Sequence, residues 1–235
     1  MSYRSWLKRL VPEPLITATR PLRLYFDPQH RFDRKFDVET TGFIEPEDLG
    51  ATEARPDETG GYEATPRAAF LRIIRSLRLE YERYTFVDMG SGKGAVLLYA
   101  AEFPFKRIVG VEFSPELHRI AELNLKSYRG RAVCRSIRSI CMNAAVFPIP
   151  CEPSVLFFFN PFKGRTLEIV RENIDRTIAN GHPDLFVVYY HTLSRHPVFD
   201  RAARLRTLRR ESDHTVYAPS TTRASGNGQK SEKME

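Results

Sequence analysis

Short apolar runs alternate with longer amphipathic stretches along most of the chain. The runs are of strand length and rich in β-branched and aromatic residues, and they occupy residues 84–87, 107–111, 137–142, 154–159 and 184–190. Between most of them, apolar residues recur every three or four positions, as in helices with one buried face. This alternation predicts a parallel sheet covered by helices on both faces. Prolines between residues 148 and 153 predict an irregular crossover before the fourth strand.

A glycine-rich turn follows the first predicted strand. Asp88 ends that strand, and Gly90, Gly92 and Gly94 separate it from an alanine- and leucine-rich helix. Glycines let a ligand approach the backbone closely where a helix begins, and an acid after the next strand, here Glu112, can accept both hydroxyls of a ribose. These residues therefore predict a site for a cofactor that contains a nucleoside.

Three motifs compete for this turn. A P-loop is excluded because Gly94 follows Lys93 where serine or threonine is required, and because Val87 replaces the first glycine. A dinucleotide fingerprint fits Gly90, Gly92 and Ala95, although such a match is weak by itself. The third pattern, acid-x-Gly-x-Gly-x-Gly, is complete from Asp88 to Gly94.

That third pattern resembles motif I of the class I S-adenosylmethionine-dependent methyltransferases. The resemblance implies S-adenosylmethionine as the cofactor, with its amino-acid end at the first acid and the glycine turn and its ribose at the second acid. It also implies that the aromatic residue after the second acid packs on the adenine. An Asn-Ala pair stands where the family usually has Asp-Ala, and its amide oxygen can accept the adenine amino group. The implied cofactor residues are Asp88, Gly90, Ser91, Gly92, Gly94, Glu112, Phe113 and Asn143.

The segment before the first strand indicates which methyltransferases this chain resembles most. Tyr62 and Thr65 form a Tyr-x-x-Thr pattern similar to that of the non-SET lysine methyltransferases, the disruptor of telomeric silencing family. There the two side chains line the methionine end of the cofactor. Thr65 is also expected to cap a helix over residues 66–79, with Pro66 in the first helical position. Both roles are compatible.

The residues after the fourth strand resemble methyltransferase motif IV. Asn160, Pro161 and Phe162 lie where ligands bind in open α/β sheets, at the carboxyl end of a central strand. The resemblance implies that an amide oxygen and a backbone carbonyl hold an acceptor nitrogen beside an aromatic wall. The residues of this motif differ from those of both families, because amino methyltransferases have a second proline and the non-SET enzymes have Asn-Asn-Phe.

The resemblance completes the expected fold and domain organisation. The fold class is α/β, a Rossmann-like doubly wound sheet of seven mostly parallel strands with a C-terminal antiparallel hairpin over residues 205–210 and 215–218. Residues 1–61 are expected to be a partly irregular extension, with a polar, turn-rich stretch at 33–50. The methyltransferase domain covers residues 62–218, and the polar residues 219–235 form a disordered tail.

The composition of the chain limits the classes of protein to which it can belong. The 235 residues contain three cysteines without Cys-x-x-Cys spacing and six scattered histidines, so neither a disulfide framework nor a metal site is expected. The apolar runs are too short for a membrane span. The three cysteines are expected to be reduced, which suits a cytoplasmic protein. The net charge of +7 is uneven, with six arginines between Arg195 and Arg210 against one acid, Asp200. Such a basic stretch can bind nucleic acid, an acidic protein or an anionic membrane, or it can be a solvated face; of the partners we expect nucleic acid and no membrane.

The sequence thus predicts transfer of a methyl group to an amine nitrogen, in particular a protein lysine. The acceptor can instead be an amine of a nucleic acid or a small molecule. A cofactor-binding module without activity stays open because of Asn143 and the incomplete motif IV, and a nicotinamide-dependent reductase is the weakest alternative. Tyr190 and His191, at the end of the fifth strand, are the candidate bases, although a buried structural histidine is the simpler interpretation.

Overall fold

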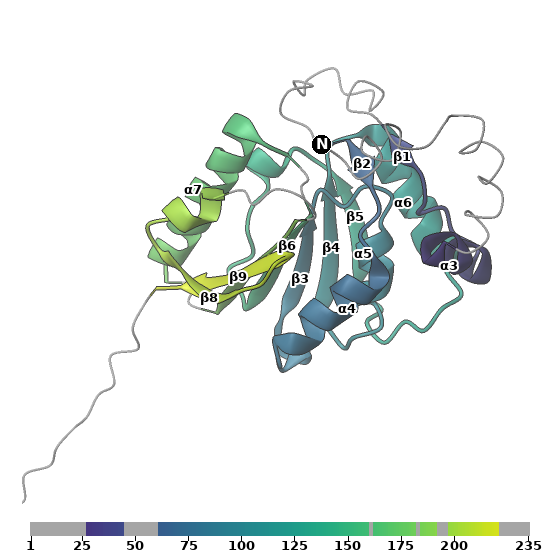
Figure 1. The fold of residues 1–235 in the computed structure, drawn as a ribbon, viewed down its shortest axis with the longest axis horizontal. Helices are drawn as coiled ribbons and strands as arrows, with labels where there is room; N and C mark the ends of the chain where they lie inside the picture. Colours follow the sequence, from purple (N-terminus) through teal and green to yellow (C-terminus); the bar gives the residue numbers. More distant parts are fainter. Residues whose placement is uncertain (1–26, 45–60, 160–161, 182–183, 192–196, 221–235) are drawn as a thin grey trace, which may run out of the picture.

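The computed structural model describes residues 27–44, 61–159, 162–181, 184–191 and 197–220. Its core is a seven-stranded sheet in the order β5-β4-β3-β6-β7-β9-β8 (Figure 1). The parallel strands are β3 (Thr85–Met89), β4 (Arg107–Glu112), β5 (Ile137–Cys141), β6 (Ser154–Phe159) and β7 (Leu185–Tyr190). The antiparallel strands are β8 (Leu205–Arg210) and β9 (His214–Pro219). The predicted fold class is confirmed.

Helices cover both faces of this sheet, as Figure 1 shows. On one face lie α4 (Arg67–Ser76), α5 (Ala95–Ala100) and α6 (Pro115–Ser127), and on the other lies α7 (Gly164–Ala179). Alternate strand residues point to opposite faces, so Phe86 and Phe157 pack in the α4 and α5 core while Leu156 and Phe158 pack in the α7 core. The central strands are therefore apolar throughout because both of their faces are buried.

Three short 3-10 helices and a small second sheet complete the described part. The 3-10 helices are η3 (Tyr81–Arg83), η4 (Ala144–Val146) and η5 (Pro197–Arg201). Of these, η4 is the only helical turn between β5 and β6, which confirms the irregular crossover. The second sheet pairs β1 (Phe43–Ile44) with β2 (Tyr62–Glu63), antiparallel. Among the described residues, no helix is long and apolar enough to cross a membrane.

Two local expectations need correction. Residues 28–36 form the helix α3 (Pro28–Phe36), although the sequence suggested that the region from residue 33 onward consists of turns. Asp27 caps this helix by accepting from the Gln29 N–H, and Phe32 and Phe36 pack together one turn apart. Pro66, and not Thr65, is the N-cap of α4, without a side-chain cap. The polar composition of α3 hid these two apolar positions.

We predict that Phe70→Ala strongly destabilises the fold. Phe70 is fully buried and its ring lies within 6.5 Å of the rings of Phe86, Tyr99, Phe103 and Phe157. Truncating it removes this contact and leaves a cavity, which costs about 3–5 kcal/mol of unfolding free energy in urea titrations. The exposed Leu208, changed to alanine, is the control and should change stability by less than about 1 kcal/mol. A small loss in the Phe70 variant would contradict this packing.

We also predict that Glu152 makes stability depend on acidic pH. Its carboxylate pairs with Lys106 and Arg107 and accepts from the Thr85 hydroxyl at the amino end of the sheet. Burial alone would raise its pKa, but the hydrogen bonds from Lys106, Thr85 and Arg107 lower the pKa to about 2. A depressed folded pKa stabilises the protein above the unfolded value, near 4.3, and this stabilisation is lost as pH falls toward 2.

Glu152→Gln should accordingly reduce the unfolding free energy at pH 7, and its difference from wild type should shrink below pH 4. Urea titrations between pH 2.5 and pH 7 measure this difference. A difference that does not change with pH would rule out the ionic contribution.

Candidate active site

The glycine turn joins β3 to α5 and is bound tightly to β4. The backbone N–H groups of Gly90 and Ser91 both donate to the carbonyl of Val111, at 2.8 and 3.0 Å. Gly90, Gly92 and Gly94 have φ values of 92°, 53° and 82°, in the region that glycine alone adopts readily. The turn therefore depends on glycine and ends at the carboxyl edge of the two central strands.

Two buried carboxyl groups flank this turn. Asp88 and Glu112 are each 3% exposed and lie near the carboxyl ends of β3 and β4, where Asp88 is opposite Gly110, two residues before Glu112. Glu112 accepts from the Gly92 N–H at 2.8 Å and from the Ser114 N–H at 2.9 Å. Burial raises the pKa of both carboxyl groups; repulsion from Glu112 raises that of Asp88 further, while backbone N–H donors offset part of the rise at Glu112. Ligand donors at this position would favour the ionised forms.

Of the predicted Tyr-x-x-Thr residues, Tyr62 lies beside the glycine turn. Tyr62 and Thr65 are buried, and Tyr62 donates its hydroxyl to the Thr40 carbonyl at 2.6 Å. A Cβ added to Gly92 would lie 2.4 Å from the Tyr62 ring, so the ring packs directly on the turn. Burial raises the pKa of Tyr62, and nearby acids including Asp88 and Glu112 raise it further. The structure thus brings Tyr62 together with the glycine turn and both acids, while Thr65 is buried three residues further on.

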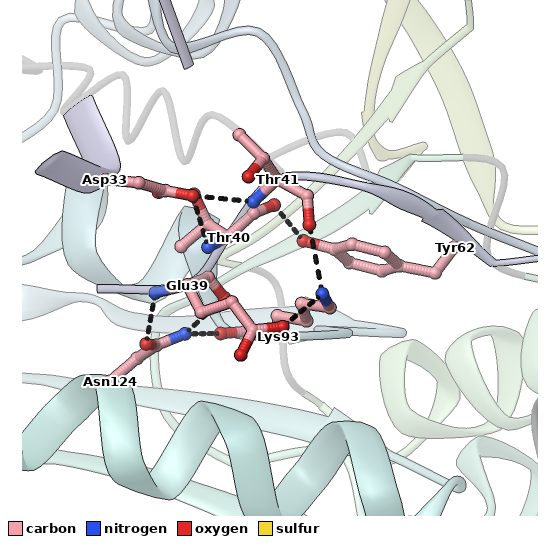
Figure 2. A network of polar contacts seen from close by, with 7 residues as sticks. All are labelled: Asp33, Glu39, Thr40, Thr41, Tyr62, Lys93 and Asn124. Atoms are coloured by element: carbon pink, nitrogen blue, oxygen red, sulfur yellow. Dashed lines mark hydrogen bonds and ion pairs between the residues drawn. The ribbon is translucent and has the colours of Figure 1, made fainter. Parts of the chain in front are cut away.

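Residues 27–44, which we call the strap, hold the outer side of the same turn. Figure 2 shows how the Asp33 carboxylate organises the strap by accepting from the backbone N–H groups of Thr40 and Thr41, both at 2.8 Å. It also accepts from the Thr40 hydroxyl. The strap therefore has a fixed conformation where Tyr62 binds it.

Lys93 and Asn124 connect the strap to the turn (Figure 2). The Lys93 ammonium is buried, contacts Glu39 at 2.7 Å and the Thr41 carbonyl at 3.0 Å, and lies 5.5 Å from the centre of the Tyr62 ring. The Asn124 amide accepts from the Glu39 N–H and donates to the carbonyls of Glu39 and Lys93. Sequence reasoning missed this network; the Asp-Pro cap of α3 was the available signal.

The two residues predicted to contact the adenine lie further along the same edge. Phe113 is half-buried and packs against Tyr62 and Leu117. Asn143 is exposed, caps η4 and accepts from the Ala145 N–H at 2.8 Å. Its oxygen retains a second lone pair for another donor.

The predicted acceptor residues are described only in part. Asn160 and Pro161 lie outside the described residues, whereas Phe162 is buried and packs edge-on against Phe158 at 6.1 Å. The candidate bases Tyr190 and His191 are buried at the end of β7, and the His191 N–H donates to the Asp213 carbonyl. Among the described residues, no cluster of His, Cys, Asp and Glu could hold a metal ion.

A comparison with models of protein families gives a match that contains β3, β4 and most of β5. Residues 58–140 match the model of the family described as histone methylation protein DOT1. This segment is DOT1-like. The DOT1-like segment contains Tyr62, Thr65, the glycine turn and Glu112, so the match confirms the resemblance predicted from these motifs. It ends before the residues that follow β6, and the acceptor region therefore lies outside it.

Two solved structures of methyltransferases are similar to parts of this chain. An RNA methyltransferase from Salinibacter ruber, in complex with S-adenosyl-L-homocysteine, has a TM-score of 0.47 and 22% identity over 67% of this chain and 95% of its own. A geranyl diphosphate C-methyltransferase from Streptomyces coelicolor A3(2) has a TM-score of 0.47 and 14% identity over 60% of this chain and 61% of its own. No curated protein sequence matches this chain.

We predict that Asn124→Ala loosens the strap. The change leaves the Glu39 N–H and the carbonyls of Glu39 and Lys93 without their side-chain partner, at a cost of roughly 1–3 kcal/mol of unfolding free energy. Hydrogen–deuterium exchange at Glu39 should become faster while exchange in β3 is unchanged. Lys126→Ala, at an exposed position of the same helix, is the control. Unchanged exchange at Glu39 would show that Asn124 does not hold the strap.

Proposed function

We propose that this chain is an S-adenosylmethionine-dependent methyltransferase that transfers a methyl group to an amine nitrogen, in particular a protein lysine. The observation that carries the proposal is the pairing of the glycine turn with Glu112 inside the DOT1-like segment. It supplies a glycine backbone for close approach and a buried acid at the end of the adjacent strand. The lysine acceptor rests on the family match and on the Asn-Pro-Phe sequence after β6.

The residues of the turn fit the proposed cofactor. The Ser91 hydroxyl is buried and has no hydrogen-bond partner within the described parts of the chain, so a bound ligand would satisfy it. Asp88 and Ser91 face the amino-acid end, together with Gly90, Gly92 and Gly94, and Glu112 accepts from the ribose. Tyr62 and Thr65 cover the methionine end, and Phe113 and Asn143 contact the adenine.

This chain's own residues then position the acceptor. The cofactor, when bound, supplies a methyl group already activated by its sulfonium. Asn160 and the Pro161 carbonyl hold the N–H groups of the amine so that its lone pair points at the methyl carbon, and Phe162 supports this segment from the α7 core. Alignment and exclusion of water are the main contributions that such a site makes to the rate.

A nucleic-acid acceptor is the second candidate. It is favoured by the edge strand β8, on which Arg206, Arg209 and Arg210 are all exposed. Only Arg210 has a carboxylate partner in the described structure, Asp200 at 2.6 Å. A phosphate-binding surface of this kind would give an affinity whose logarithm falls linearly with the logarithm of salt concentration.

The cofactor is tested by calorimetric titration of S-adenosylhomocysteine. We expect wild type to bind and Asp88→Ala and Glu112→Ala each to weaken binding at least about tenfold, because each loses a charged hydrogen-bond partner worth roughly 1.5–3 kcal/mol. Glu116→Gln, an exposed acid four residues from Glu112, is the matched control and should bind as wild type does. Absence of binding by folded wild-type protein would refute the methyltransferase proposal.

The acceptor class is tested by transfer of labelled methyl groups into a cell lysate. After the reaction, one portion is digested with protease and another with nuclease. Label released by protease and recovered as methyllysine supports the proposal, whereas label released by nuclease supports the nucleic-acid alternative. Tight cofactor binding without any transfer would indicate a binding module.

A further inference from the structure

The turn between β8 and β9 carries an aspartate–histidine pair that no motif predicted. The Nδ1 atom of His214 lies 2.8 Å from a carboxylate oxygen of Asp213. The other Asp213 oxygen accepts from the guanidinium of Arg72, on α4, at 2.5 Å. Because the aspartate fixes the hydrogen on Nδ1, the Nε2 atom of neutral His214 has a lone pair to offer. His214 is 2% exposed, and its Nε2 has no hydrogen-bond partner among the residues that the structure describes.

This pair lies at the carboxyl edge of the sheet, where the acceptor is proposed to bind. His214 is the first residue of an antiparallel strand and is opposite Tyr190, the last residue of β7. Tyr190 in turn is opposite Phe159, the last residue of β6, which directly precedes Asn160. Two strand spacings place the His214 backbone about 10 Å from that of Phe159. Residues in one such row point to the same face of the sheet, here the face that α4 covers.

Charged and titratable groups from several elements surround the pair. Arg72 contacts the pair from α4, and Tyr190, the last residue of β7, and His191, which follows it, lie beside the pair. Glu63 and Asp213 both interact with Tyr190, and Glu211 lies on the same hairpin as the pair. Burial by itself would raise the pKa of Asp213, but its contacts with His214 and Arg72 lower it. An ionised Asp213 stabilises the imidazolium that forms when His214 accepts a proton.

We propose that His214 is the general base that deprotonates the acceptor amine, held in the required tautomer by Asp213 and Arg72. The proposal rests on the proposed function, since it assumes an amine acceptor and S-adenosylmethionine. The Nε2 lone pair takes a proton from the ammonium form of the acceptor and becomes imidazolium. The freed nitrogen lone pair attacks the methyl carbon, and the carbon–sulfur bond breaks with its electrons remaining on sulfur. The products are a methylated ammonium, S-adenosylhomocysteine and protonated His214, which returns its proton to solvent.

The test is the pH profile of labelled-methyl transfer from S-adenosylmethionine to Nα-acetyl-lysine amide between pH 6 and pH 10. In wild type the rate should rise with pH and reach a plateau, because His214 and not the solvent takes the proton of the amine. In His214→Gln the rate at pH 7 should fall about 100-fold or more, and it should continue to rise toward pH 10 as the amine loses its own proton. The rate of Asp213→Asn at pH 7 should lie between the rates of wild type and His214→Gln.

Two controls separate this role from folding and from cofactor binding. His118→Gln changes a half-buried histidine on α6, paired with Ser139 and remote from the hairpin, and should keep the wild-type profile. All variants should bind S-adenosylhomocysteine with wild-type affinity in calorimetry. Nitrogen-15 NMR of histidine-labelled wild type, which needs no variant, should show neutral His214 as the Nδ1–H tautomer and a shift of its Nε2 signal on adding the lysine probe.

The outcomes are distinct. An identical plateau in wild type and His214→Gln, with intact cofactor binding, overturns the proposal, as does an Nε2–H tautomer. Transfer by wild type to RNA and not to the lysine probe also overturns it. Failure of wild type to bind S-adenosylhomocysteine refutes the proposed function itself, and the separate calorimetric measurement identifies that case.

Discussion

The hydrogen bond from the Gly92 N–H to the buried carboxylate of Glu112 links the two halves of the site. It attaches the turn after β3 to the end of β4, while the other Glu112 oxygen fixes the start of the next helix through the Ser114 N–H. A carboxylate with only 3% exposure is costly unless it is hydrogen-bonded in this way. The same carboxylate that shapes the turn is therefore the one proposed to accept from a ribose, so folding of the turn and the proposed cofactor binding depend on one residue.

Contacts with the strap and with Tyr62 hold the glycine turn from its outer side. The strap closes over it through Lys93 and Asn124, and the Tyr62 ring packs on Gly92 where no Cβ would fit. A buried ammonium needs an anionic partner, and Glu39 of the strap provides one. The strap, which precedes the glycines by about 50 residues, thereby becomes part of the proposed cofactor site.

The opposite end of the same edge has its own polar group. Asp213 and His214 face the row of Tyr190 and Phe159, two strands from the residues proposed to hold the acceptor. The glycine turn and Glu112 lie on this edge because the parallel strands all end there. His214 lies there because β9 is antiparallel to them and therefore begins at the same edge. One topological rule thus gathers residues that are up to about 125 positions apart.

Local patterns in the sequence determined the fold class and predicted the glycine turn and the acid after β4. The strand-length apolar runs, the three glycines after Asp88 and the acid at Glu112 are short-range features, and short-range geometry is what such patterns encode. The strap, Lys93, Asn124 and the Asp213–His214 pair depend on contacts across 31 to 141 positions, such as Asn124 with Lys93 and Arg72 with Asp213. A lone lysine, asparagine or histidine carries no periodicity, so only the tertiary structure decided which of them are buried and what they face.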